Sequence, residues 1–250
     1  MLDAGYASKF CGRFAFLNAH VFGRLGRALL RPFIWRQQQS YGGAQLTKRL
    51  RLSCIWLLVL LQRGLRRVSP LLHSITPPTV LLYTDAEGSG KVGAVAEFSD
   101  GEILFLRGVV PSKVKHMLAP RRTQIVAFEL LAALVGLVAL APAKLRGMRV
   151  RHFIDNSAAL ACVVRGFSRH TDLALVAGRF WVEIADLHLE YFACFVETHS
   201  NLSDGPSRDD ISTLMQLGAS EVCPWHFPAF KGGLGDWMCC VQEVHRVLRR

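Results

Sequence analysis

The sequence lacks the cysteine pattern of a disulfide-rich or zinc-binding protein. Its seven cysteines are odd in number and scattered along the 250 residues, so they do not form a disulfide framework. A reducing compartment, the cytoplasm or the nucleus, is therefore expected. No Cys-x-x-Cys pair is present, and this absence argues against zinc at a group near the C-terminus. That group consists of Cys223, His226, Cys239, Cys240 and His245.

Apolar runs long enough to cross a membrane are also missing. The run at residues 52–61 is too short, and the longer run at residues 125–142 contains Glu129, a carboxylate that is costly in hydrocarbon. The N-terminus has no compact apolar stretch leading to a signal-peptide cleavage site. We therefore expect no membrane partner. A membrane-associated protein inserted by residues 52–61 and 125–140 stays an alternative, which solubility without detergent would test.

Acidic residues are nearly absent from the first third of the chain. Residues 1–79 hold 12 Lys or Arg residues and one acid, Asp3, whereas residues 80–250 hold 18 residues of each sign. The net charge of +11 therefore belongs to a basic arm joined to a neutral body. Such an arm indicates a polyanionic partner, either nucleic acid or an anionic membrane surface. It is also typical of an organelle transit peptide, so organelle targeting stays open.

The remaining composition is that of a folded protein. Apolar residues make up 51% of the chain and charged residues 20%, which excludes disorder over most of its length. In the arm, apolar residues at three- and four-residue steps predict two helices, at residues 10–38 and 44–67, before a proline-containing linker at residues 69–79. The expected domains are a basic helical arm with its linker, a body, and an extension of unknown role. Their boundaries are residues 1–77, 78–210 and 211–250.

After the linker the pattern changes to a mixture of strands and helices. Short β-prone runs bounded by turn residues predict five strands, at residues 80–84, 92–98, 103–110, 149–154 and 187–197. Apolar periodicity predicts helices at residues 123–140, 156–164 and 171–186. The tight turns between the first three strands indicate an antiparallel meander. The expected fold class is α/β, with a mixed central sheet flanked by helices.

Four acidic residues occupy distinctive places in this order of elements. Asp85 and Asp155 each end a predicted strand, Glu129 lies in the apolar helix, and Asp204 ends a polar loop. Taken singly, each acid is also a common turn, cap or helix-edge residue. Convergent carboxylates repel one another unless a divalent cation neutralises them, and oxygen ligands favour Mg²⁺ or Mn²⁺. Two such ions about 3.5–4 Å apart are the usual arrangement for phosphodiester hydrolysis, so the four acids together indicate this chemistry.

Four short segments around these acids resemble a known family. They are Tyr83-Thr84-Asp85-Ala86, Phe128-Glu129-Leu130-Leu131-Ala132, Phe153-Ile154-Asp155-Asn156-Ser157 and Ser200-Asn201-Leu202-Ser203-Asp204-Gly205-Pro206-Ser207-Arg208. In this order they resemble the acidic motifs of retroelement ribonuclease H domains, most closely those fused to retrotransposon reverse transcriptases. The resemblance, over residues 80–208, implies a ribonuclease H-like fold with a five-stranded mixed sheet and flanking helices. It also implies metal-dependent cleavage of the RNA strand in RNA/DNA hybrids, with Asp85, Glu129, Asp155 and Asp204 as the metal-binding catalytic acids.

The resemblance also implies partners. Residues 23–32 and the helix up to Arg67 resemble the segment that joins a polymerase thumb to its ribonuclease H, which implies the reverse transcriptase polymerase domain of the same element as a partner. This chain has no Tyr-x-Asp-Asp motif and cannot polymerise itself. Cellular members grip the hybrid with a basic, Trp-containing handle that is missing here. We therefore expect RNA/DNA hybrid or other nucleic acid to be bound by the arm, Arg165, Arg169 and Arg208, with His199 and Asn201 as auxiliary candidates.

Two alternatives remain at this point. A catalytically silent module from a decayed element would bind nucleic acid without cutting it. Integrases and 3′–5′ exonucleases also use sets of acids, but a glutamate in the helix after the third strand favours a ribonuclease H. For a shared metal site, Asp85, Glu129 and Asp155 are predicted to lie within about 10 Å of one another, because one or two ions cannot bridge a longer distance.

Overall fold

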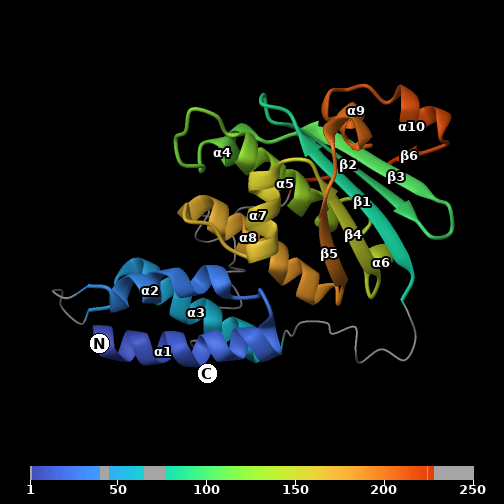
Figure 1. Cartoon of the computed structure of the whole chain (residues 1–250). Coiled ribbons are helices and arrows are strands. Elements are labelled where there is room, and N and C mark those ends of the chain that lie inside the picture. The colour runs from blue at the N-terminus through green and yellow to red at the C-terminus, as the bar shows by residue number, and fades with distance from the viewer. Residues whose placement is uncertain (1, 40–44, 65–76, 224, 228–250) are drawn as a thin grey trace.

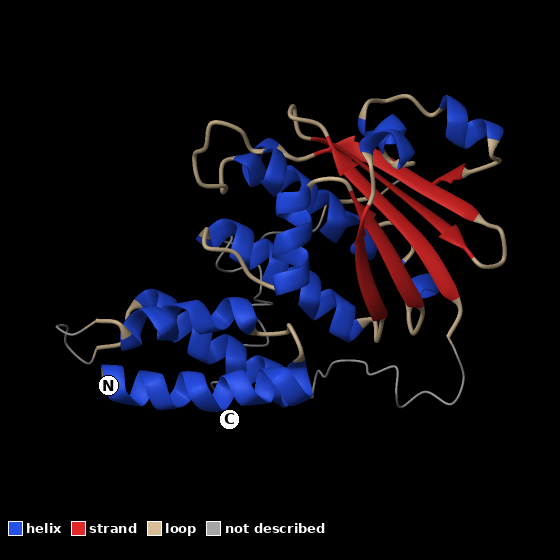
Figure 2. Ribbon diagram, viewed as in Figure 1, coloured by secondary structure: helices blue, strands red, loops and turns tan. Residues whose placement is uncertain are grey.

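The computed structural model describes residues 2–39, 45–64, 77–223 and 225–227. Within these ranges the chain has a helical N-terminal part and an α/β part (Figure 1, Figure 2). Most of the predicted linker lies outside the described residues, as do Cys239, Cys240 and His245 of the group considered for zinc. The five described cysteines, Cys11, Cys54, Cys162, Cys194 and Cys223, are free thiols.

In its described residues, the N-terminal arm contains three α-helices where the sequence predicted two helices. They are α1 (Ala4–Leu17), α2 (Arg31–Gln37) and α3 (Lys48–Arg63). The single helix predicted over residues 10–38 is wrong, because Gly23 and Gly26 both adopt positive φ angles, 63° and 81°, that interrupt the helical backbone. Likewise α3 ends before residue 67, since Gly64 forms a left-handed C-cap. Phe14, Leu25, Phe33 and Leu60 are among the buried side chains that hold the arm together.

The α/β part is built on one mixed sheet. Its strands are β1 (Thr79–Ala86), β2 (Lys91–Phe98), β3 (Ile103–Val109), β4 (Arg149–Ile154), β5 (Glu190–Phe195) and β6 (Ser220–Glu221). Their order is β5-β4-β1-β2-β3-β6, with β1 antiparallel to β2 and parallel to β4. This confirms the predicted fold class and the meander. The sheet has six strands where five were predicted, because β6 is only two residues long and leaves no periodic pattern.

Helices lie on both faces of this sheet (Figure 1). The elements after β3 are α4 (Ser112–Lys115), α5 (Ile125–Val138), α6 (Pro142–Leu145), α7 (Ser157–Arg165), α8 (Thr171–Asp186), α9 (Asp204–Ser207) and α10 (Ser212–Gln216). α5 lies against β1 and β2 on one face, between the sheet and α7 and α8. A Cβ at Gly136 of α5 would lie 2.9 Å from the Thr84 side chain, so only glycine allows this close approach. Because α5 is enclosed in this way, its apolar residues are buried on every side of the helix.

A smaller core lies on the opposite face of the sheet. It joins Val95 of β2 and Phe105 of β3 to Leu214 and Ala219, so residues beyond the predicted boundary at 210 pack on the sheet. The domain boundaries themselves stay a prediction. In the part of the chain that the structure describes, no helix is both long and apolar enough to cross a membrane.

Candidate metal centre

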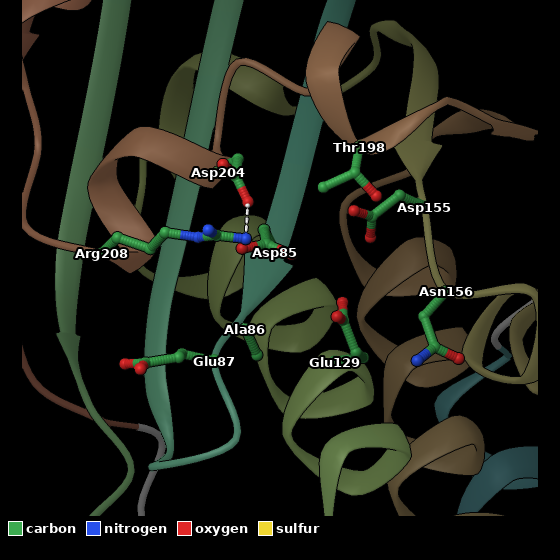
Figure 3. Close-up of a pocket in the computed structure, with 9 residues that line it drawn as sticks. All are labelled: Asp85, Ala86, Glu87, Glu129, Asp155, Asn156, Thr198, Asp204 and Arg208. Atoms are coloured by element: carbon green, nitrogen blue, oxygen red, sulfur yellow. Dashed lines mark ion pairs between the residues drawn. The ribbon is translucent and has the colours of Figure 1, made fainter.

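The fold brings the predicted acids to one edge of the sheet. β1 and β4 are parallel neighbours with Thr84 opposite Ile154, so the residues that follow, Asp85 and Asp155, emerge side by side. Glu129 reaches the same point from α5, and Asp204 reaches it from the start of α9 (Figure 3). The four side chains line a cleft of about 240 Å³.

Three of the four acids form a tight cluster. Carboxylate oxygens of Asp85, Glu129 and Asp155 all lie within 4.8 Å of one another, which confirms that these three acids converge. Among the described residues this is the one group of three or more side chains with the spacing of a metal site. Asp204 is not a member of this group, and its Oδ1 lies 2.7 Å from the Arg208 guanidinium. In the described part of the chain, an ion pair therefore involves Asp204 but none of the three clustered acids.

Two acids of the cluster are buried and Asp155 is half-buried, so that ionisation of the cluster is electrostatically unfavourable. Glu129 is 3% exposed and Asp85 is 5% exposed. Burial, together with the neighbouring charges of Asp85 and Asp155, raises the pKa of Glu129 to about 9. Burial also raises the pKa of Asp85 to about 6, against the opposing effect of a hydrogen bond from Ser207 and with further increases from Asp155 and Asp204. Without a cation, Glu129 and Asp85 in the folded protein therefore stay protonated at pH values above those at which glutamate and aspartate usually ionise.

The donor set suits a hard divalent cation. Glu129 Oε2 is buried and has no hydrogen-bond partner among the described residues, and Figure 3 shows its carboxylate pointing toward Asp85 and Asp155. A buried carboxylate oxygen without a donor is costly unless a cation satisfies it. Because all the ligand atoms are oxygens, the cluster fits Mg²⁺ or Mn²⁺ better than a soft metal. The acidic cluster can therefore hold a metal ion.

Ser207 is a site residue that the sequence reasoning missed. Its hydroxyl donates a hydrogen bond to Asp85 and also contacts the Asp204 carbonyl at 2.9 Å, so α9 is tied to the end of β1. Gly93 lies opposite Asp85 in β2, and a Cβ there would lie 2.7 Å from backbone atoms of Ser203 and Ser207. Only glycine at position 93 allows α9 to pack so closely. The three-residue step from Asp204 to Ser207 was the available signal, because it places both residues on one side of a helical turn.

Other residues around the cleft were also not predicted. Glu87, Asn156 and Thr198 line it with the acids. Asn156 is the N-cap of α7, where its side chain accepts hydrogen bonds from the amides of Ala158 and Ala159. The cap fixes the chain directly after Asp155, so the start of α7 helps to set the position of this acid.

The two auxiliary candidates do not line the cleft. Asn201 is buried, and its amide donates to the Thr84 carbonyl at 3.3 Å while its oxygen accepts from the Ser203 hydroxyl at 2.7 Å. It therefore fastens the 198–204 loop to β1. His199 is exposed, with its ring 3.4 Å from the Glu197 carboxylate. The structure gives His199 no contact with the acids.

The predicted nucleic-acid contacts are separated in space. Arg208 lines the cleft beside Asp204. Arg165 ends α7 and Arg169 precedes α8; both are exposed and neither lines the cleft. Their role in binding stays a prediction.

Of the comparisons with known proteins, the one with solved structures found matches. No protein-family model matches the sequence, and no curated protein matches it. Among solved structures, 66 chains match. One is the N-terminal ribonuclease H domain of rv2228c from Mycobacterium tuberculosis, determined as a fusion with maltose-binding protein. It is 18% identical, the match covers 57% of this chain and 99% of that chain, and the TM-score is 0.34.

Proposed function

We propose that this protein is a nuclease that uses divalent metal ions to cleave the RNA strand of RNA/DNA hybrids. The observation that carries the proposal is the cluster of Asp85, Glu129 and Asp155, whose oxygens lie within 4.8 Å of one another. No side chain in the described part of the chain supplies this cluster with a cation. A folded protein tolerates such mutual repulsion where it serves to bind a metal.

The residues of the cleft have distinct tasks in the proposed reaction. Two Mg²⁺ or Mn²⁺ ions, when bound, would supply activation of the attacking water and stabilisation of the leaving oxygen. Asp85, Glu129 and Asp155 would hold the metal, and Asp204 provides a fourth carboxylate in the same cleft. Ser207 orients Asp85 through its hydrogen bond.

Arg208 is proposed to bind the phosphate of the substrate. Its guanidinium lines the cleft and pairs with Asp204 in the absence of substrate. A guanidinium forms two parallel hydrogen bonds with a phosphate as readily as with a carboxylate. Arg208 can therefore exchange one partner for the other when a strand enters the cleft.

A hybrid-cleavage assay tests the proposal. The RNA strand of a labelled RNA/DNA hybrid should be cut in Mg²⁺ or Mn²⁺ and should stay intact in EDTA. Double-stranded DNA, double-stranded RNA and each single strand are the substrate controls, and Glu129→Gln is the matched inactive variant. Cleavage in EDTA, equal cleavage by the variant, or no cleavage of hybrid in either metal would overturn the proposal.

A second candidate is a module of the same fold that binds nucleic acid without cutting it. The ion pair between Asp204 and Arg208 favours this reading, because it removes one carboxylate from those available to a cation. Retained binding of hybrid with no metal-dependent cleavage would support it over the nuclease.

The biological setting belongs to the same proposal. A retroelement origin, a polymerase domain as partner, and domain boundaries at residues 77 and 210 rest on the resemblance of the sequence motifs. Addition of the separately expressed polymerase domain would test the partnership, because a true partner should bind this chain and position its cleft on the nascent hybrid.

A further inference from the structure

Two basic side chains of the arm, Arg24 and Arg27, attach it to the α/β part. Arg24 donates a hydrogen bond to the Val164 carbonyl, and its guanidinium lies 5.0 Å from the centre of the Trp181 ring. Arg27 donates to the Arg165 carbonyl at 3.2 Å. These carbonyls belong to the last turn of α7, where a helix has no partner of its own for them. Arg24 and Arg27 are therefore occupied within the protein.

Close packing at Gly166 fixes this attachment. Gly166 is the C-cap of α7 with a φ of 71°, and a Cβ there would lie 2.8 Å from Arg24 Cβ and 3.0 Å from the Arg24 carbonyl oxygen. The arm therefore has a defined face toward α7 and α8 and a defined face toward solvent. In Figure 1, α1 is the outermost helix of the arm.

The solvent side of α1 combines aromatic rings with positive charge. We name it the α1 outer face and define it by five exposed residues at three- and four-residue steps. Tyr6, Lys9, Arg13 and Phe16 lie in α1, and His20 lies in the π-helical turn that follows it, at Asn18–Phe22. Tyr6 and Phe16 are each 66% exposed. Ala7, Cys11 and Phe14 lie on the opposite side of the helix and are buried in the arm. Among the described residues, the α1 outer face is thus exposed while the opposite side of α1 packs in the arm.

On this face two cations, Lys9 and Arg13, lie between the ring of Tyr6 and the rings of Phe16 and His20. The Lys9 ammonium lies 5.7 Å from the centre of the Tyr6 ring, and the rings of Phe16 and His20 are 4.3 Å apart. The single acid of the arm, Asp3, accepts a hydrogen bond from the Tyr6 amide at 2.8 Å and caps the start of α1. Within the ranges that the structure describes, no ion pair joins an acid to Lys9 or Arg13.

We propose that the α1 outer face binds single-stranded nucleic acid. Lys9 and Arg13 are suited to contact successive phosphates, and the exposed rings of Tyr6 and Phe16 are suited to stack on unpaired bases. The proposal rests on the proposed function for the identity of the polymer. It adds that the arm binds the unpaired strand that flanks an RNA/DNA hybrid.

The arrangement favours nucleic acid over a membrane surface. A helix that lies in a bilayer interface places its apolar residues on one face and its cations on the other. Here the two kinds of residue share one face, so insertion of the rings would carry Lys9 and Arg13 toward the hydrocarbon. A strand of nucleic acid presents both phosphates and flat bases along its length, so it can contact the cations and the rings of one face together.

Binding of labelled single-stranded RNA and DNA to the full chain tests the proposal. Tyr6→Ala with Phe16→Ala should weaken binding about tenfold or more through lost stacking. Lys9→Ala with Arg13→Ala should reduce the log–log salt slope by about 1.4, at about 0.7 for each phosphate contact on a single strand. Lys48→Ala with Arg49→Ala is the matched control, because both residues are exposed cations of the arm outside the α1 outer face. All these side chains are solvent-exposed, so the variants should keep the wild-type circular dichroism spectrum.

The possible results separate the two proposals. If the α1 variants bind single strands as the control variant does, the inference is overturned. It is also overturned if α1 variants lose binding to anionic phospholipid vesicles while oligonucleotide binding is unchanged. Cleavage of a blunt hybrid without flanking strands is measured on the same proteins. Its failure in the wild-type chain would remove the proposed nuclease and leave the binding result to stand by itself.

Discussion

Replacement of Glu129 by glutamine should stabilise the folded protein when no metal is present. Glu129 is buried in α5, its Oε2 has no hydrogen-bond partner among the described residues, and Asp85 and Asp155 are its nearest charges. Glutamine keeps the shape of the side chain and removes its ability to ionise. The variant therefore isolates the electrostatic cost of placing this carboxylate in the cleft.

The magnitude of the effect follows from the shift in pKa. Unfolding returns the carboxyl group to an ordinary pKa of 4.5, whereas the folded protein holds it at about 9. Between these values the unfolded state binds fewer protons than the folded state, so the free energy of unfolding falls as the pH rises. Each pH unit in this window costs about 1.4 kcal/mol, which amounts to about 3 kcal/mol at pH 7. Below pH 4.5 the two proteins should have the same stability.

Urea denaturation in EDTA at several pH values measures this difference. The gap between Glu129→Gln and wild type should open from pH 4.5 upward, and the urea midpoint of the variant should depend less on pH. Glu87→Gln is the matched control, since Glu87 also lines the cleft but is exposed and lies outside the cluster. Mg²⁺ at a hundredfold excess over its Kd should add about 2.7 kcal/mol to wild type and much less to the variant. A wild type that is as stable as the variant at pH 8 in EDTA would refute the electrostatic account of the cluster.

Three further substitutions test other parts of the structure. Asp155→Asn should lower hybrid cleavage at least a hundredfold with an unchanged circular dichroism spectrum; cleavage at the wild-type rate would mean that Asp155 does not bind metal. Arg208→Ala should tighten Mg²⁺ binding in calorimetry, because Asp204 loses its ion-pair partner, and should raise the KM for hybrid; weaker Mg²⁺ binding would contradict the pairing. Arg24→Ala should lower the free energy of unfolding by about 1 kcal/mol and speed proteolysis of the arm, whereas Arg31→Ala, at an exposed position, should do neither. Equal proteolysis of these two variants would show that Arg24 does not hold the arm.

The central strands and the positions of three acids could be predicted because both depend on the local pattern of apolar and polar residues in the sequence. Alternating or continuous apolar runs mark β1, β2 and β4, and an acid at the end of two parallel neighbours must lie at one edge of the sheet. The convergence of Asp85 and Asp155 therefore follows once the strands are assigned. Glu129 could be assigned to the same site because an unpaired carboxylate in an apolar helix needs a partner.

The features that escaped prediction depend on contacts between distant residues. β6 exists because two residues pair with β3, and Ser207 reaches Asp85 only because Gly93 lets α9 approach β2. His152 is a further example: it is fully buried, hydrogen-bonds to Thr84 and Tyr191 at 2.7 and 2.8 Å, and joins three strands beneath the cleft. Burial lowers its pKa to about 3, so it acts there as a neutral partner. Nothing in its sequence neighbourhood indicates this network.

The division of the four acids gives Arg208 a role that a structural arginine would not have. In the ranges that the structure describes, no side-chain cation pairs with Asp85, Glu129 or Asp155, whereas Asp204 pairs with the Arg208 guanidinium in the same cleft. If Arg208 turns to a phosphate, Asp204 loses its partner and its carboxylate becomes available to a cation. Binding of substrate and of metal at Asp204 would then favour each other, and by linkage the effect must be equal in both directions. If Arg208 has only a structural role, its removal should weaken the binding of both metal and hybrid. If Arg208 exchanges Asp204 for phosphate, its removal should instead tighten the binding of metal and weaken the binding of hybrid. These opposite effects distinguish the two roles.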